Sequence, residues 1–359
     1  MPSRKRKRAA GDEGEQASAP PQPTPRSSRL KSSRTQPSTL RDKAPQPTPA
    51  ETRSFPTTPE HQGEGSQDAS DARKNRLDVN FSKVTYDEVA PKVGLLPSLR
   101  GGDIPTFEMF RALLPNSVFL KILDDVRILS LQYGPLSQHI NEEARACFLS
   151  AYFNRIMAEF SGLLYNTPEA MLEGNIATKG RVEYQFKTFG GVTVVFIEVK
   201  LDIGNLTERL DCYAQVIAEC DACAWMNFQN GFYVPIMAVL CDGHCFYFFK
   251  FEDRRQAGEA SQIFLGKFPE GHLRQSIAEL APGDDPTDFL RQTRFLCESL
   301  YYVFLSGYQS GLVGYWNQSV ERSKSSPREL TPKWYNATVW AGKALEEASL
   351  LGTFDTRIN

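Results

Sequence analysis

The sequence predicts an α/β fold, because stretches with helical periodicity alternate with stretches of strand character. A helical stretch over residues 141–164 is followed by a β-hairpin over 181–201, a helix over 206–225 and a second hairpin over 232–251. With 359 residues, 41% of them hydrophobic, the chain is long enough to bury a full core. We therefore expect an α/β core over residues 141–255.

The first helix of this core has a clear start and one apolar face. Asn141 can accept hydrogen bonds from free backbone N–H groups, and acidic residues follow in the first turn, where they are favourable. An apolar stripe then recurs at four-residue spacing and is expected to face a core. It consists of Phe148, Tyr152, Ile156 and Phe160.

Both hairpins are predicted from turn residues between runs of β-branched and aromatic residues. A Gly-Gly pair at 190–191 separates RVEYQFKTF from VTVVFIEVKL, and an Asp-Gly pair at 242–243 separates the two apolar runs of the second hairpin. The helix between the hairpins begins near Asn205 or Thr207, either of which can cap it.

The core is flanked by segments of different composition. Residues 1–75 are rich in Pro, Ser, Thr, Gln and charge and contain few large apolar residues, so we expect a disordered basic tail. Residues 76–140 show short helical patterns and are expected to form an N-terminal helical extension. Residues 256–359 are expected to form a C-terminal helical region.

The tail contains a run of five basic residues from Arg4 to Arg8. Consecutive cations on a flexible arm are typical of a nuclear import signal, to which an import receptor would bind. The alternative is a basic arm that contacts nucleic acid. We therefore expect the protein in the nucleus.

Charge and hydropathy exclude several classes of protein. The longest apolar run, from Phe232 to Cys241, stops at ten residues, whereas a membrane span requires about 18. Beyond residue 72 the chain carries 29 Lys+Arg and 34 Asp+Glu, a net charge of −5. This balance argues against a protein that coats nucleic acid by charge alone.

The first hairpin is expected to bring two acidic residues together. If the two glycines form a two-residue turn, Phe189 pairs with Val192 and Glu183 lies directly opposite Glu198. Opposed Cβ atoms are about 4.5–5.5 Å apart, where like charges are destabilising. A divalent cation such as Mg²⁺ would compensate, because it prefers carboxylate oxygens as ligands.

Two further side chains are expected beside this pair. Lys200 points to the same side as Glu198, where its ammonium can position a metal-bound water and stabilise charge on a phosphate. Gln215 on the following helix can reach the rim and hydrogen-bond substrate or water. This arrangement predicts hydrolysis of phosphodiester bonds. The alternative is a solvated strand face with ordinary ion pairs, such as Lys200 with Glu183.

These residues resemble the PD-(D/E)XK nuclease-like superfamily, and more closely its fungal members with a basic, disordered N-terminal tail. The resemblance rests on GRVEYQF at 180–186, VVFIEVK at 194–200 and AQ at 214–215, and it covers residues 141–253. It implies a restriction-endonuclease-like α-β-β-β-α-β core in which acidic residues, a Glu-x-Lys and a helical glutamine surround one or two Mg²⁺ ions.

Carried over to this chain, the resemblance implies Mg²⁺ ligands at Glu183, at Glu198 and at either Glu142 or Glu143. Glu183 takes the place of the usual aspartate. Lys200 and Gln215 are then the catalytic residues. The expected activity is Mg²⁺-dependent cleavage of nucleic acid, with DNA favoured over RNA and the choice between them left open by the sequence. The superfamily also includes members that bind without cutting, so the alternative is a catalytically inactive protein that binds nucleic acid or a protein partner.

Four cysteines have a spacing that fits zinc, namely Cys220, Cys223, Cys241 and Cys245. The first pair would lie in a helix and the second on either side of a tight turn. Packing as small apolar side chains is therefore the favoured interpretation, with zinc as the alternative. The odd total of seven cysteines indicates free thiols in a reducing compartment.

Overall fold

The computed structural model describes residues 76–97, 103–280, 283–325 and 332–354. All of these belong to one compact unit. The expected disordered tail, with the basic run from Arg4 to Arg8, lies outside the described residues.

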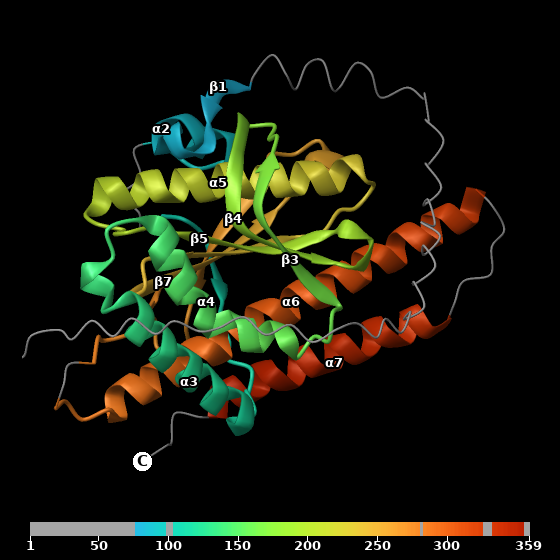
Figure 1. Cartoon of the computed structure of the whole chain (residues 1–359). Helices are drawn as coiled ribbons and strands as arrows, with labels where there is room; N and C mark the ends of the chain where they lie inside the picture. The colour runs from blue at the N-terminus through green and yellow to red at the C-terminus, as the bar shows by residue number, and fades with distance from the viewer. Residues whose placement is uncertain (1–75, 98–102, 281–282, 326–331, 355–359) are drawn as a thin grey trace, which may run out of the picture. The chain divides into compact units, whose positions relative to one another are not determined.

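Within the described residues, nine strands form one sheet (Figure 1). The strands are β1 (Leu77–Asn80), β2 (Thr106–Glu108), β3 (Leu164–Leu172), β4 (Ala177–Thr188), β5 (Thr193–Val199), β6 (Ile236–Cys241), β7 (Cys245–Glu252), β8 (Gln262–Lys267) and β9 (Gln275–Ser276). The helices are α2 (Tyr86–Val89), α3 (Asn116–Tyr133), α4 (Glu142–Ala158), α5 (Leu206–Gln229), α6 (Thr287–Ser325) and α7 (Pro332–Phe354).

The sheet is mixed, and its strands lie in the order β1-β4-β5-β6-β7-β8-β2, with β3 paired to β4 and β9 to β7. Strands β5 and β6 run parallel and are connected by α5. The pairs β3-β4, β4-β5, β6-β7 and β7-β8 are antiparallel. From α4 to β6 the chain therefore runs helix, three strands, helix, strand, which confirms the predicted α/β class.

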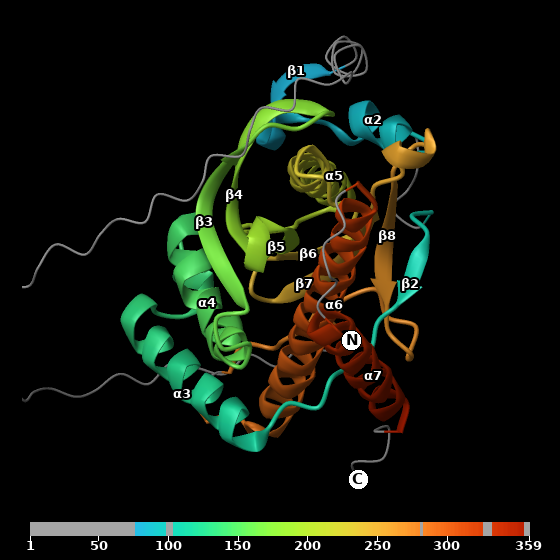
Figure 2. The same cartoon turned by 90° about the vertical axis from the view of Figure 1, so that its right-hand side faces the viewer.

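Two hydrophobic cores lie on the two faces of the sheet, and Figure 2 shows the helices that lie on both sides of the strands. On one face, α5 packs against the strands and α2 packs against α5. On the other face, α4 and α6 cover the strands, and α3 packs against α4. Because α5 has the sheet on one side and the N-terminal segment on the other, it is buried along most of its length. Among the described residues, no helix is both long and apolar enough to cross a membrane.

Local sequence explains why α5 begins where it does. The Asn205 side chain accepts hydrogen bonds from the backbone N–H groups of Thr207 and Glu208, at 3.0 and 3.3 Å. The Glu208 carboxylate reaches back to the backbone N–H of Asn205 at 3.1 Å, completing a capping box. The predicted helix is confirmed, with Asn205 rather than Thr207 as its cap.

The turn of the first hairpin differs from the prediction. Gly190 and Gly191 lie in a 3-10 turn rather than a two-residue loop. Thr188, rather than Phe189, pairs with Val192, and its backbone N–H donates to the Val192 carbonyl at 2.9 Å. Both glycines have positive φ, 84° and 80°, a conformation that favours glycine. The resulting shift of the ladder is confined to the turn end of the hairpin.

The sequence patterns do not predict β3. The predicted helix over 141–164 ends at Ala158, after which Ser161 and Gly162 adopt left-handed conformations and reverse the chain. Strand β3 is largely exposed, so it lacks the alternation that marks a half-buried strand. The segments 76–140 and 256–359, expected to be helical, also contribute strands to the sheet, namely β1, β2, β8 and β9.

Candidate active site

A pocket of about 460 Å³ opens beside the carboxyl end of β5. Its walls come from β4, β5, α5, the first turn of α4 and the segment after β1. All five residues predicted for the site line it, namely Glu142, Glu183, Glu198, Lys200 and Gln215. The fold therefore brings these side chains together from four separate elements.

Glu183 and Glu198 lie opposite each other on β4 and β5. Tyr184 pairs with Ile197 in the ladder, so the next residues along the two strands are Glu183 and Glu198. The register predicted for this end of the hairpin is thus present. Glu183 Oε2 accepts a hydrogen bond from the backbone N–H of Val199 at 3.0 Å. The carboxylate of Glu198 is only 3% exposed.

Glu198 is the centre of the polar contacts. Its Oε1 accepts hydrogen bonds from Lys200 Nζ at 2.7 Å and from Gln215 Nε2 at 2.5 Å. Lys200 Nζ also lies 3.7 Å from Glu142 Oε1. The Oε2 atom of Glu198 is buried and has no hydrogen-bond partner among the described residues. The predicted lysine and glutamine therefore both contact the same carboxylate.

A third buried carboxylate, Glu219, was not predicted. Gln215 Nε2 also donates to Glu219 Oε1 at 2.8 Å, and Glu219 is 0% exposed. Its Oε2, like that of Glu198, is buried without a hydrogen-bond partner in the described part of the chain. The sequence does contain one indication of its role: Glu219 follows Gln215 by four residues, which places both side chains on the same face of α5.

Burial and mutual repulsion shift the pKa values of these groups. Burial, together with the negative charges of Glu198 and Glu142, raises the pKa of Glu183 to about 8. Burial also raises the pKa of Glu198, and in Glu219 burial and the charge of Glu198 raise the pKa strongly. Burial alone would lower the pKa of Lys200, but the charges of Glu198 and Glu142 outweigh it and raise that pKa. The pocket thus holds more acidic groups than its single buried ammonium can neutralise.

The donor set fits a divalent cation in its chemistry. Carboxylate oxygens are the ligands that Mg²⁺ prefers. Two of them, Glu198 Oε2 and Glu219 Oε2, are buried and have no hydrogen-bond partner within the described segments. The other oxygen of Glu198, Oε1, is in contact with Lys200 Nζ at 2.7 Å. No group of three or more His, Cys, Asp or Glu side chains in the described segments is arranged to hold a metal ion.

The free energy of unfolding is expected to fall by about 1–2 kcal/mol between pH 6.5 and 8 in the presence of a chelator. Carboxyl groups whose pKa is higher in the folded than in the unfolded state bind more protons when folded, so stability is lost as pH rises toward that higher pKa. Below pH 6.5 the lowered pKa of His139 acts in the opposite direction. Urea unfolding at the two pH values checks this. Glu183→Gln should flatten the dependence, and an unchanged slope would contradict the assignment.

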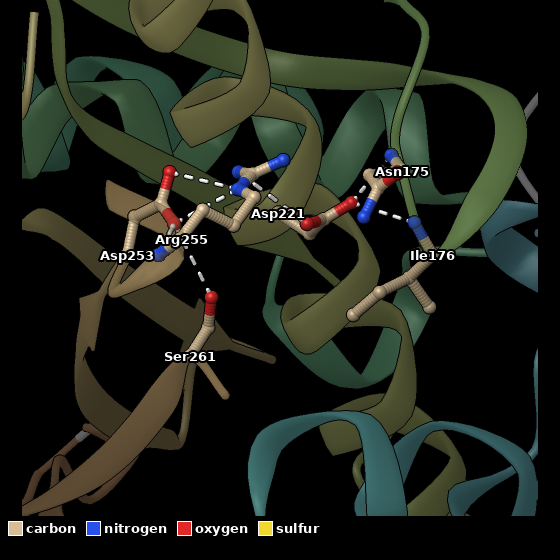
Figure 3. A network of polar contacts seen from close by, with 6 residues as sticks. All are labelled: Asn175, Ile176, Asp221, Asp253, Arg255 and Ser261. Carbon is tan, nitrogen blue, oxygen red and sulfur yellow. Dashed lines mark hydrogen bonds and ion pairs between the residues drawn. The ribbon is translucent and has the colours of Figure 1, made fainter. Parts of the chain in front are cut away.

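A separate charged network ties the connection between β3 and β4 to α5 (Figure 3). Asp221 Oδ2 accepts hydrogen bonds from the backbone N–H groups of Asn175 and Ile176, at 2.6 and 2.7 Å. The guanidinium of Arg255 lies 3.6 Å from Asp221 Oδ1 and donates to Asp253 Oδ1 at 2.8 Å. This network holds the start of β4 against α5, and so places the acidic residue of β4 relative to those of the helix.

The four cysteines lie in different surroundings. Cys220 and Cys223 are buried on α5, in the core between α5 and the sheet. Cys241 belongs to the core on the opposite face, and Cys245 is half-buried at the start of β7. The two pairs therefore do not converge on one point.

Comparisons with known proteins add little to this geometry. No protein-family model matches the chain, and no curated protein matches it. A cryo-EM structure of a DrdV–DNA complex is similar over 59% of this chain and 18% of that chain, with 10% sequence identity and a TM-score of 0.26.

Proposed function

We propose that this chain is a Mg²⁺-dependent nuclease that hydrolyses phosphodiester bonds of nucleic acid, with DNA as its substrate. The observation that carries the proposal is the convergence of Glu183, Glu198, Lys200 and Gln215 in one pocket, with buried carboxylate oxygens that lack partners. The helix, three-strand, helix, strand order from α4 to β6 supports a restriction-endonuclease-like core. That order is the one implied by the resemblance to the PD-(D/E)XK superfamily.

Glu183 and Glu198, with Glu142 at the rim, would hold the Mg²⁺ ion. When bound, Mg²⁺ supplies a water of lowered pKa and neutralises charge that develops on the phosphate. Lys200 keeps its proton at neutral pH and offers a fixed positive charge at the floor of the pocket.

Gln215 and Glu219 orient the site from the helix. The Gln215 amide uses its N–H groups to hold Glu198 and Glu219 at the same time, so it sets the direction in which the Glu198 carboxylate points. Glu219 acts as a positioning residue through Gln215, and its Oε2 has no hydrogen-bond partner among the described residues.

A specific observation favours the second function, a binding protein that does not cut. The ammonium of Lys200 is 2.7 Å from Glu198 Oε1, and no three acidic groups of the described chain are arranged around a metal position. If the ion pair persists when metal is present, the same pocket serves as a binding surface for nucleic acid or a protein partner.

Incubation of the full chain with supercoiled plasmid and with an end-labelled single-stranded DNA tests the proposal. Cleavage is expected with Mg²⁺ or Mn²⁺ and is expected to vanish with EDTA, as resolved on denaturing gels. A matched RNA strand decides between DNA and RNA. Intact substrates under every divalent cation would overturn the nuclease assignment, and binding without cleavage would support the second function.

A nuclear location and recognition by an import receptor remain part of the proposal. Both rest on the basic run from Arg4 to Arg8 in the sequence.

A further inference from the structure

A second pocket, of about 760 Å³, lies on the other flank of α5, toward β7 and β8. Five polar residues that line it are Arg209 and Tyr213 from α5, Tyr247 from β7, and His272 and Arg274 from the segment between β8 and β9. None of its lining residues is an aspartate or glutamate. This pocket is therefore basic, in contrast to the acidic pocket described above.

Both arginines line this pocket together with two buried tyrosines. Tyr213 and Tyr247 are buried, with ring centroids 5.7 Å apart, and Arg274 Nη1 donates to the Tyr247 hydroxyl at 3.2 Å. Arg209 and Tyr213 are four residues apart on α5, so their side chains lie on the same face of the helix. Burial raises the pKa of Tyr213, and the charges of Arg209 and Arg274 oppose that rise. Within the described part of the chain, neither arginine forms an ion pair with a carboxylate.

The basic pocket is aligned with the acidic one across the sheet. Glu198 on β5 pairs with Leu240 on β6, and Leu240 pairs with Tyr247 on β7. Directly paired residues point to the same face of a sheet. Since neighbouring strands are about 4.8 Å apart, Tyr247 lies about 10 Å from Glu198 along one row of that face. Helix α5 packs over this buried row. Residues 204–208 at its start are exposed, so a ligand that contacts both pockets would pass over the start of α5.

We propose that the pocket lined by Arg209 and Arg274 binds a backbone phosphate of the nucleic-acid strand whose phosphodiester bond lies at the acidic site. This inference rests on the proposed function. Guanidinium groups suit phosphate because their N–H groups form paired, charge-assisted hydrogen bonds.

Binding of a fluorescein-labelled single-stranded DNA 20-mer to the full chain tests this inference. Fluorescence anisotropy is measured in EDTA, where no cleavage interferes, over a series of salt concentrations. The double variant Arg209→Gln/Arg274→Gln is expected to bind at least about tenfold more weakly and to lower the salt slope by roughly 1 to 2. The double variant Arg127→Gln/Arg291→Gln removes the same number of charges, from two exposed ion pairs, and serves as the matched control.

Two measurements separate a binding role from a structural one. Arg209→Lys keeps the positive charge and should retain most of the binding. Thermal unfolding of each variant shows whether the fold is intact. Wild-type affinity and salt slope in a folded double variant would overturn the inference. Competition by free dAMP as strong as that by the 20-mer would also overturn it, because the ligand would then be a nucleotide and not a strand.

The outcomes for the two proposals are distinguishable. If the wild type cuts DNA and the arginine variants bind like the wild type, only the phosphate pocket is wrong. If the wild type never cuts, but its binding depends on both arginines, the phosphate pocket stands and the nuclease assignment falls.

Discussion

Glu198→Gln is expected to lower Mg²⁺-dependent DNA cleavage at least about 100-fold while the protein stays folded. The glutamine side chain has nearly the same shape, and its oxygen can still accept hydrogen bonds from Lys200 and Gln215. It lacks the negative charge that a divalent cation requires at the end of β5. The loss should therefore fall on the chemical step and on metal affinity, not on the fold.

Initial cleavage rates with saturating DNA, together with a calorimetric titration of Mn²⁺, measure both effects. Glu173→Gln changes an exposed glutamate outside the pocket in the same way and should cut like the wild type. Wild-type cleavage by Glu198→Gln would show that this carboxylate does not serve the reaction, and the candidate site would then be wrong.

Lys200→Met is expected to lower the free energy of unfolding by about 3–5 kcal/mol at pH 7 in the presence of a chelator. The Lys200 side chain is 15% exposed and pairs with Glu198, which is 3% exposed. Its removal leaves that buried carboxylate without its neutralising charge. Methionine preserves most of the apolar stem, so the loss reports the charge rather than the packing.

Urea unfolding followed by circular dichroism gives this difference. Lys179→Met removes an exposed ammonium from the lining of the same pocket and should change stability by less than about 1 kcal/mol. Added Mg²⁺ should restore part of the loss in Lys200→Met, because a cation bound only by the folded state stabilises it. Equal stability of the two variants would mean that Lys200 is not the charge that balances the pocket.

Local pattern was enough to predict much of the candidate site. Glu183 lies opposite Glu198 as predicted, although the turn pairs one residue out of the predicted register. An irregularity between Phe186 and Lys187 offsets that slip, which would otherwise turn one of the two side chains to the other face. The turn itself was mispredicted, since two consecutive glycines permit several backbone conformations. The capping box at Asn205 sets the start of α5. The start of the helix in turn sets where Gln215 lies along β5, beside Glu198.

The sequence by itself determined the α/β class, the helix caps and the presence of the first hairpin, because these depend on neighbours in the chain and on short-range periodicity. The register that pairs Glu183 with Glu198 also needed an irregularity in the ladder that the sequence did not predict. Only the tertiary structure decided that Glu219 lies beside Glu198 and that β3 pairs with β4. It also decided that Arg209 and Arg274 line the same pocket as two tyrosines. Each of these depends on which face of α5 packs on the sheet and on which distant strands become neighbours. The packing of the whole core sets that choice, and no single segment contains the information.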